Sequence, residues 1–244
     1  MSMNRSRNIE VCFSPDQYNL FKKDQKIVVA IDVLRATSAI CAGIDNGVKS
    51  IIPVSTIEEA KQFKEQGYIV AAERKGEIVE GFSMGNSPYG FMKDEVIGKD
   101  VVLTTTNGTK AINIAAQDTP VVVIGSLLNL DALCEWISQQ EGDVLCLCSG
   151  WKDKFNLEDT ICAGAMVNCL IESGDFYSNE DASIAAKYLF QSAKNNYFGF
   201  LKSSSHRRRL RKLNLNEDIK FCLTPNQTQA IPILEGDRIV ALNS

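Results

Sequence analysis

The sequence predicts an α/β fold: a mostly parallel sheet with helices on both faces, followed by a mixed C-terminal part of helices and short strands. The first observation is the rhythm of the chain, because apolar runs of strand length alternate with helical segments up to residue 174. Alternating βα units with right-handed crossovers build parallel sheets by default. The second is the run IVVAI at residues 27–31, whose continuous apolar character is typical of a strand covered on both faces.

The elements of the first part are expected in a regular order. Strands are expected at residues 10–13, 26–33, 50–54, 68–72, 101–104, 120–125 and 143–148. Helices are expected at residues 38–46, 55–67, 108–117 and 130–139, with a further one running through Ala163 to Gly174. Ser55 and Glu58 have the spacing of a capping box, which predicts the start of the second helix. Residues 75–88, KGEIVEGFSMGNSP, are interpreted as a long loop of the functional or mobile kind.

The pattern changes after Gly174. Helices are expected over residues 179–200 and 205–213, and short strands around Phe221, at 231–234 and at 238–242. With 244 residues the chain is long enough for one large domain or for a domain with a smaller appendage. We expect an α/β core over residues 1–174 that carries the site motifs and a C-terminal part over residues 175–244. Whether that part packs on the same domain is left open.

Composition and charge exclude several classes of protein. A net charge of −4, with 45% apolar and 23% charged residues, gives no reason to expect a nucleic acid or an anionic membrane as partner. The sequence has neither a signal-peptide core nor an apolar run of ~18 residues, so a cytoplasmic protein is expected.

Eight cysteines without CxxC spacing are interpreted as buried hydrophobes, and the single histidine, His206, argues against a zinc site. The sequence leaves both a monomer and a homo-oligomer open.

The basic run HRRRLRK at residues 206–212 is the one local feature that raises nucleic acid as a partner. Leu210 and Leu213 have helical spacing within an acidic chain, so a solvated helix face with an apolar stripe is the favoured interpretation. The sequence leaves open whether His206 or a neighbouring arginine reaches an anionic site elsewhere.

Polar side chains recur where successive apolar strands end. They are Asp32 and Arg35, then Glu73 and Arg74, then Thr104 to Asn107, then Ser126, then Ser149 with Gly150. The carboxyl ends of parallel strands meet at one edge of a sheet, and ligands bind beyond that edge. We therefore expect these groups to converge on one site.

The residue types at this edge suit a metal ion and a phosphorylated ligand. Asp32 and Glu73, joined by Asp159 or Glu158, supply the hard oxygen ligands that Mg²⁺ prefers. Arg35 and Arg74 are able to bind anionic oxygens through two parallel hydrogen bonds. The segment TTTNGT, residues 104–109, adds hydroxyls and backbone N–H groups at the start of a helix, which is an anion-binding arrangement. A small, multiply anionic, phosphorylated substrate is the expected partner.

Each of these features also has a structural explanation. Asp32 could cap the following helix or pair with Arg35, and the pair Glu158 and Asp159 could complement a helix dipole. TTTNGT and GNSP could be turn sequences only. Among sharper motifs, GxxxxGK[ST], GxSxG and paired aspartates two residues apart are absent at these positions. Cys148 could be a nucleophile, but its alternation with Cys146 favours packing.

Four ordered blocks carry a family resemblance. IDVLRATSAI, AERKGEIVEGFSMGNSP, TTTNGTKA and CSGWKDKFNLEDTICAG resemble the blocks of the 2-phosphosulfolactate phosphatase (ComB) family. The resemblance runs from about residue 28 to about residue 164, with a weaker echo over residues 206–222. It implies a soluble, Mg²⁺-dependent α/β phosphatase that hydrolyses 2-phosphosulfolactate to sulfolactate and phosphate, a reaction that serves coenzyme M synthesis in methanogens.

The resemblance also singles out the residues of the site. Asp32, Arg35, Glu73, Arg74, Asn107 and Asp159 fall at motif positions, and their chemistry suggests their roles. The metal is expected on Asp32, Glu73 and Asp159, and these three together with Arg35 are the expected catalytic groups. The expected substrate-binding residues are Arg74, Asn86, Ser87, Thr105, Thr106, Asn107, Thr109, Ser149 and Gly150. Whether Asp32 acts as nucleophile or as metal ligand is left open.

The chain departs from the family pattern at three positions. The family blocks read GERGG and GFDxGNSP, whereas this chain has Ala72, Lys75 and Ser83 in place of glycine, glycine and aspartate. Lys75 brings bulk where a glycine would let the backbone approach a ligand. These departures motivate a second hypothesis for the function, namely a protein that binds a phosphorylated ligand without turning it over. The third hypothesis is a cysteine hydrolase that uses Cys148.

Overall fold

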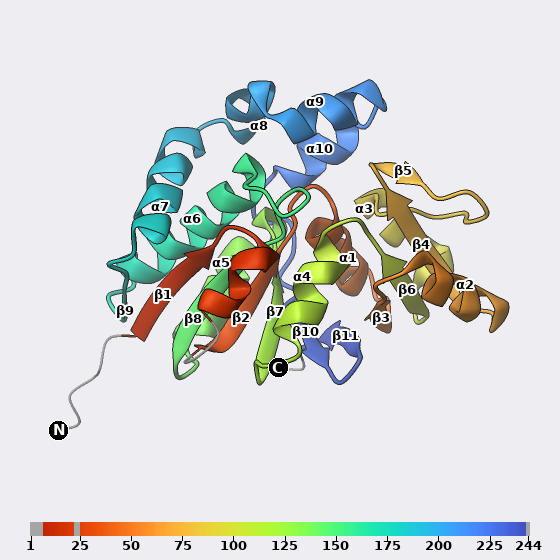
Figure 1. Ribbon diagram of the computed structural model, residues 1–244, viewed down its shortest axis with the longest axis horizontal. Coiled ribbons are helices and arrows are strands. Elements are labelled where there is room, and N and C mark those ends of the chain that lie inside the picture. Colours follow the sequence, from red (N-terminus) through yellow and green to blue (C-terminus); the bar gives the residue numbers. More distant parts are fainter. Residues whose placement is uncertain (1–6, 22–24, 243–244) are drawn as a thin grey trace.

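The computed structural model describes residues 7–21 and 25–242 and contains one eleven-stranded sheet (Figure 1). The strand order is β5-β4-β6-β3-β11-β10-β7-β2-β8-β1-β9. The strands are β1 (Arg7–Cys12), β2 (Gln25–Ile31), β3 (Ser50–Pro53), β4 (Ile69–Arg74), β5 (Glu77–Ile78), β6 (Asp100–Thr104), β7 (Val121–Gly125), β8 (Asp143–Cys148), β9 (Phe176–Tyr177), β10 (Pro232–Glu235) and β11 (Arg238–Ala241). The expected fold class, a mostly parallel sheet with a mixed C-terminal part, is confirmed.

The helices fill the connections between strands. They are α1 (Ala36–Asp45), α2 (Ile57–Glu65), α3 (Pro88–Phe91), α4 (Gly108–Ala115), α5 (Leu130–Ser138), α6 (Leu157–Glu172), α7 (Asp181–Ala193), α8 (Tyr197–Phe200), α9 (Ser205–Lys212) and α10 (Asn216–Cys222). Short 3₁₀ turns add η1 (Pro15–Leu20), η2 (Asp94–Val96), η3 (Leu127–Asn129) and η4 (Leu201–Ser203). Within the described ranges, no helix is long and apolar enough to cross a membrane.

The sheet consists of two parallel blocks joined by the C-terminal hairpin. One block contains β7, β2, β8, β1 and β9, and the other contains β3, β6 and β4. The hairpin β10–β11 lies between them, with Ile233 opposite Val123 of β7 and Ile239 opposite Ile51 of β3. Both contacts are antiparallel. The predicted division of the chain at residue 174 stays a prediction, although residues 175–242 contribute three strands, β9, β10 and β11, to the sheet.

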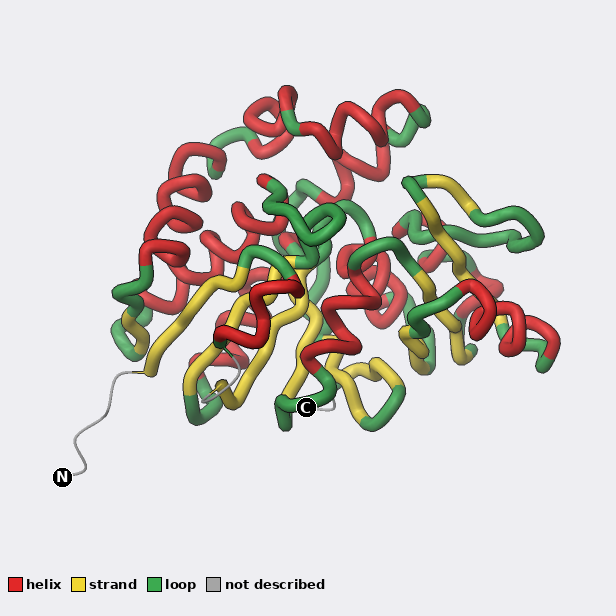
Figure 2. The backbone as a smooth tube through the Cα atoms, viewed as in Figure 1, coloured by secondary structure: helices red, strands yellow, loops and turns green. Residues whose placement is uncertain are grey.

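Helices lie on both sides of the strands (Figure 2). Along β2, Val29 packs in the cluster formed with α5 and α6, while Val28 packs on the opposite side against Ala111 and Ala115 of α4. In the second block, Ala60 of α2 packs in a cluster with residues of β3, β4 and β6. This alternation explains the apolar run of β2, because a strand covered on both faces has no position left for a polar side chain.

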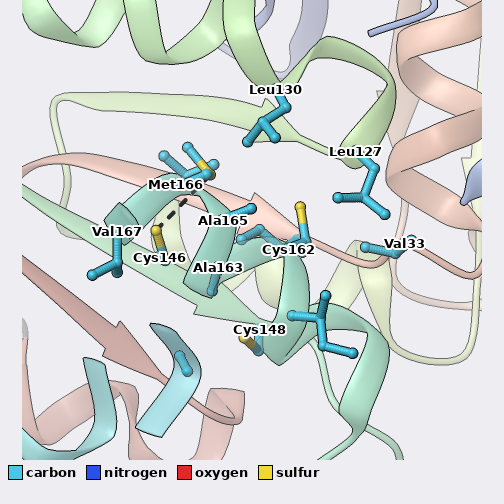
Figure 3. Close-up of a cluster of buried hydrophobic side chains, with 14 of the residues drawn as sticks. Val33, Leu127, Leu130, Cys146, Cys148, Cys162, Ala163, Ala165, Met166 and Val167 are labelled. Atoms are coloured by element: carbon cyan, nitrogen blue, oxygen red, sulfur yellow. Dashed lines mark hydrogen bonds between the residues drawn. The ribbon is translucent and has the colours of Figure 1, made fainter. Parts of the chain in front are cut away.

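The core on the α5–α6 side is rich in sulfur (Figure 3). Cys146, Cys148 and Cys162 are fully buried there, and the Sγ atom of Cys146 lies 4.0 Å from Sδ of Met166. Every described cysteine is free. The interpretation of the cysteines as packing residues therefore agrees with their positions.

Three expectations for individual elements are wrong. The capping box of α2 is formed by Thr56 and Glu59, one residue later than expected, although Glu59 also accepts a hydrogen bond from the Ser55 N–H. The expected helix over residues 179–200 is interrupted before α8, where the side chain of Asn196 accepts from the Gly199 N–H and caps a new turn. Phe221 lies in α10 and not in a strand.

The C-terminal helices cover one end of the sheet. In Figure 1, α8, α9 and α10 lie across the top of the molecule, above the ends of β2 and β8. The contact is close, because a methyl group on Gly76 would come within 2.8 Å of Cδ1 of Leu213 and 3.2 Å of Cδ2 of Leu210. The basic run at the start of α9 is therefore packed over the edge at which the site residues were expected.

Candidate active site

A small buried pocket lies at the junction of the two parallel blocks, beneath α9. Its volume is about 10 Å³. It is lined by Asp32, Leu34, Arg35, Glu73, Gly76, Asn86, Thr106, Asn107, Trp151, His206 and Leu210. Ligand sites of open α/β sheets typically lie at such a change of strand order.

Asp32 is the first residue after β2, and its side chain is buried at the floor of this pocket. A methyl group on Gly108 would lie 2.8 Å from Oδ2 of Asp32, so the start of α4 lies directly against the carboxylate. Burial raises the pKa of Asp32 well above its ordinary value, and the carboxylates of Asp159 and Glu73 raise it further. The backbone N–H of Ala36 is the opposing influence, since its hydrogen bond lowers this pKa.

Glu73 lies near the end of β4 and is also buried. Its Oε2 accepts a hydrogen bond from the Thr106 N–H at 3.1 Å, and its Oε1 accepts from the Thr106 hydroxyl at 3.1 Å. The Gly76 N–H donates to Oε1 as well. Glu73 therefore ties together the two loops that follow β4 and β6, and both of its oxygens are already engaged.

Arg35 caps the start of α1 and is 4% exposed. Its Nη1 lies 2.6 Å from Oδ2 of Asp218 on α10, and its Nη2 donates to the Gly76 carbonyl at 2.8 Å. The pairing with Asp32 that the sequence allowed is therefore not the pairing observed. The Nε atom is buried without a hydrogen-bond partner among the described residues, so a polar atom of this guanidinium remains available within the pocket region.

Asp159, in the first turn of α6, is fully buried and fully hydrogen-bonded. Its Oδ1 accepts from the Val33 N–H at 2.9 Å, and its Oδ2 accepts from the Gly150 N–H at 3.1 Å and from Asn156 at 2.8 Å. Burial raises the pKa of Asp159 to about 7, with a further contribution from Glu158. Asp159 thus holds the loops after β2 and β8 together, and it does not line the pocket.

The predicted amide and hydroxyl groups divide into two sets. Asn86 and Asn107 line the pocket, and Oδ1 of Asn86 is buried without a partner among the described residues. Ser149 is buried with its hydroxyl unpartnered, while its N–H bonds to the Ile31 carbonyl at 2.8 Å. Ser87 lies at the start of α3 and is not among the lining residues.

A second, larger cavity lies on the other side of Thr106. Its volume is about 410 Å³, and its lining includes Arg74, Thr105, Thr109 and Lys110. The Arg74 guanidinium donates to the Thr104 hydroxyl at 3.0 Å and thus points away from Asp32. Three of the expected substrate-binding residues therefore face this neighbouring cavity, and Thr106 is the wall that it shares with the Asp32 pocket.

The C-terminal part supplies lining residues that the strand-end pattern does not reveal. His206 and Leu210 of α9 form the roof of the pocket, and Trp151 lies beside them. The signals in the sequence were the basic run that begins at His206 and the weaker family resemblance over residues 206–222. Because α9 is distant in sequence from every strand end, no spacing rule connects it to Asp32.

The groups around Asp32 fit a hard divalent cation of the Mg²⁺ type. Asp32 lies among several carboxylates, and Asn86 presents a buried, unpartnered amide oxygen to the same pocket. Over residues 7–21 and 25–242, no three acidic, histidine or cysteine side chains group closely enough to enclose an ion. Such a site suits Mg²⁺, which usually takes one or two carboxylates and completes its shell with water and substrate oxygens.

Comparison with known proteins identifies the family. The family model described as 2-phosphosulpholactate phosphatase matches residues 12–237. The chain belongs to this family. Two relatives called "Probable 2-phosphosulfolactate phosphatase" are 40% identical to it: one from Caldanaerobacter subterraneus over 216 residues (87% of this chain, 89% of the relative), and one from Thermotoga maritima over 209 residues (86% and 89%). A relative of the same name from Clostridium acetobutylicum is 36% identical over 227 residues, covering 92% and 96%.

Family membership confirms the resemblance drawn from the sequence blocks and assigns the protein to a family of phosphoric monoester hydrolases. The match also extends past the four blocks, since it includes α9 and α10. The helices that roof the pocket are therefore part of the family domain.

None of the three departures from the family blocks lines the Asp32 pocket. Lys75 has φ +57° and is exposed, so the position requires the left-handed conformation for which glycine is better suited. Ser83 is exposed and Ala72 is buried within β4, and neither lines the pocket. Ser83 stands where the family block has an aspartate, and this position contributes no side chain to the pocket in the structure.

Cys148 is poorly placed to be a nucleophile. It is fully buried in the core cluster of Figure 3, and burial raises the pKa of its thiol well above the ordinary value. Because the thiolate is the reactive form, an enclosed and protonated thiol is unreactive. The geometry thus opposes the cysteine-hydrolase reading.

Proposed function

We propose that this protein hydrolyses the phosphomonoester of 2-phosphosulfolactate to sulfolactate and phosphate, with Mg²⁺ as its cofactor. The observation that carries the proposal is the pocket at the junction of the two blocks. Buried carboxylates of Asp32 and Glu73 lie there beside the guanidinium of Arg35. Phosphoryl transfer is catalysed mainly by positioning and by electrostatic stabilisation, and a site with both signs of charge offers both. The names of the relatives support this substrate.

In the proposed reaction the chain's own residues bind and orient the phosphate. Arg35 contacts its non-bridging oxygens, and Asp218 holds the guanidinium in place for this role. Asp32 and the amide oxygen of Asn86 would hold Mg²⁺, which when bound polarises the phosphate oxygens and neutralises developing charge. Glu73 keeps the loop of Thr106 against the pocket. Asp32 lies at the same place whether it binds the ion or attacks phosphorus itself.

The size of the pocket implies that its roof opens during the reaction cycle. A volume of about 10 Å³ is the size of one water molecule, which is too small for a phosphate ester. Leu210 and His206 close the pocket from α9. We infer that α9 moves outward when substrate enters and returns to exclude water during hydrolysis. The neighbouring cavity with Arg74 would then bind an acidic group remote from the phosphate.

A phosphate-release assay tests the proposal. The purified protein is expected to release phosphate from 2-phosphosulfolactate with Mg²⁺ present. Treatment with EDTA should abolish the release, and added Mg²⁺ should restore it, because neutralisation of the crowded carboxylates depends on the ion. Other phosphomonoesters that lack a second acidic group should be poorer substrates, since they have no anionic group for Arg74 to bind.

Two outcomes would count against the proposal in different ways. Tight, Mg²⁺-assisted binding of 2-phosphosulfolactate in calorimetry without any phosphate release would favour the binding protein without turnover. Phosphate release that is unaffected by EDTA would show that the reaction does not depend on Mg²⁺. The proposed phosphatase activity itself would still be supported.

A glycine next to Asp32 offers a further test of the site. In Gly108→Ala the new methyl group would lie 2.6 Å from Cβ of Ala36 and 2.8 Å from Oδ2 of Asp32, so the carboxylate or the start of α4 must shift. We expect phosphate release to fall roughly 10²-fold, because a displacement of about 1 Å in an active site has effects of this size. Gly90→Ala is the matched control, since its nearest neighbour is the flexible end of Met84 at 3.3 Å. Equal activity in both variants would show that Gly108 does not set the position of Asp32.

A further inference from the structure

A histidine and a buried glutamate form a pair at the roof of the Asp32 pocket. Nδ1 of His206, on α9, lies 2.6 Å from Oε1 of Glu158, in the first turn of α6. The Glu158 side chain is 1% exposed and the His206 side chain 10%. Because Nδ1 is taken by the carboxylate, Nε2 is the nitrogen that the ring has available for the pocket.

The orientation of this imidazole is fixed from several sides. The ring of Trp151 lies against it with centroids 5.6 Å apart, and the guanidinium of Arg209 covers Trp151 at 4.0 Å. Oε1 of Glu158 also accepts a longer hydrogen bond from the Asn156 amide at 3.4 Å, while Oε2 is buried and has no partner among the described residues. A carboxylate that accepts from Nδ1–H sets the tautomer and the orientation of the ring.

The position of His206 relative to Asp32 matters for phosphoryl transfer. Asp32 lines the pocket from the end of β2, whereas His206 lines it from α9. Figure 1 shows α9 above this end of the sheet. In an in-line displacement the attacking and leaving oxygens lie on opposite sides of phosphorus. If attack comes from the side of Asp32, the leaving oxygen faces α9.

We propose that His206 is a catalytic residue that donates a proton from Nε2 to the leaving ester oxygen, and that Glu158 is the positioning residue behind it. The inference rests on the proposed phosphatase activity. The P–O bond to the ester oxygen breaks with its electron pair on that oxygen, and the proton of Nε2 bonds there to give the alcohol. A new P–O bond forms on the opposite side, either to the oxygen of water or to a carboxylate oxygen of Asp32, and in the second case water then hydrolyses the acyl phosphate. The neutral ring then takes a proton from solvent. This proton replaces the one given to the ester oxygen and balances the proton that the consumed water releases.

The test compares two leaving groups. His206→Asn keeps an amide near the position of Nδ1 for Glu158 and removes Nε2. For 2-phosphosulfolactate, whose alkoxide leaving group needs a proton, kcat is expected to fall about 10²- to 10³-fold with little change in KM. For acetyl phosphate, a small acyl phosphate whose acetate leaves without a proton, kcat should stay close to that of the wild type. Glu158→Gln should lower kcat for 2-phosphosulfolactate by a smaller factor and should again leave kcat for acetyl phosphate nearly unchanged.

Controls separate this role from a structural one. Arg211→Ala changes an exposed residue of the same helix and should leave both activities unchanged. Equal losses on both substrates, or no loss on either, in His206→Asn would overturn the inference. If the wild-type protein hydrolyses acetyl phosphate but not 2-phosphosulfolactate, the proposed substrate is rejected, and the comparison proceeds with glycerol phosphate as the alkyl ester. If it hydrolyses no phosphate ester at all, both proposals are rejected together.

Discussion

Replacing Asp32 by asparagine is expected to lower phosphate release by at least about 10³-fold while making the folded protein more stable. The activity falls because the variant lacks the carboxylate that binds the ion or attacks phosphorus, and loss of a principal electrostatic group has effects of this order. The stability rises because burial removes the charged Asp32 carboxylate from water and neighbouring carboxylates repel it, and an uncharged amide of the same shape avoids both costs. Thermal unfolding in EDTA, together with kcat at saturating Mg²⁺, measures both effects.

The pH dependence of this stability difference follows from the direction of the pKa shift. The pKa of Asp32 is raised in the folded state, so folding favours the protonated carboxyl. The wild type therefore loses stability relative to Asp32→Asn as pH rises from about 4, the unfolded value, through the raised folded value. Below pH ~4 the two proteins should unfold at similar temperatures. At neutral pH the melting temperature of the variant should be higher by about 2–4 °C for each kcal/mol of burial and repulsion cost removed.

Asp159→Asn is the matched comparison, because Asp159 is an equally buried carboxyl with a different environment. Both of its oxygens accept hydrogen bonds from N–H groups. An amide must turn its NH₂ group toward one of these donors, so this variant should lose stability. A higher melting temperature in Asp159→Asn, or a lower one in Asp32→Asn, would contradict the separation of a functional carboxylate from a structural one.

The positions of Asp32 and Glu73 were predictable because a local rule applies to both. Each follows or ends a run of apolar residues, and such runs mark buried strands whose carboxyl ends carry ligand sites. The same rule brought Arg74 into the predicted site, and the family resemblance brought Asp159, but neither revealed where these side chains point. Both carboxylate oxygens of Asp159 accept hydrogen bonds from backbone N–H groups, and Arg74 faces the neighbouring cavity. Orientation depends on contacts between loops, which spacing along the chain does not report.

The contribution of the C-terminal part was not predictable for a related reason. The hairpin β10–β11 pairs with β7 and β3, strands more than a hundred residues earlier, through one residue pair on each side. Its short strands give weak periodic signals, and nothing local specifies their partners. The same holds for His206, which meets Glu158 across 48 positions, and for Asp218, which meets Arg35 across 183. Charged residues whose partners lie so far away along the chain are interpreted from the sequence as solvent-exposed surface residues.

Breaking the Arg35–Asp218 pair is expected to have the largest effect on stability. The two side chains are 5% and 9% exposed and lie 2.6 Å apart. Arg35→Met leaves Asp218 buried without its partner, which should cost about 3–5 kcal/mol of unfolding free energy. The double variant Arg35→Met with Asp218→Leu removes both charges and should recover much of that loss, because buried ion pairs are often replaceable by apolar residues of similar volume. Denaturant unfolding of the wild type, both single variants and the double variant measures the coupling.

Activity should not recover with stability in the double variant. If Arg35 binds the phosphate, its removal should keep kcat/KM roughly 10²- to 10³-fold below the wild type even where the fold is restored. Arg35→Lys keeps the charge but not the planar fork that bonds Asp218 and the Gly76 carbonyl together, so it should be folded and still impaired. Recovery of both stability and activity in the double variant would show that Arg35 only anchors α10 to the pocket. Recovery of stability alone is expected, because the guanidinium that anchors α10 is also the pocket's cation.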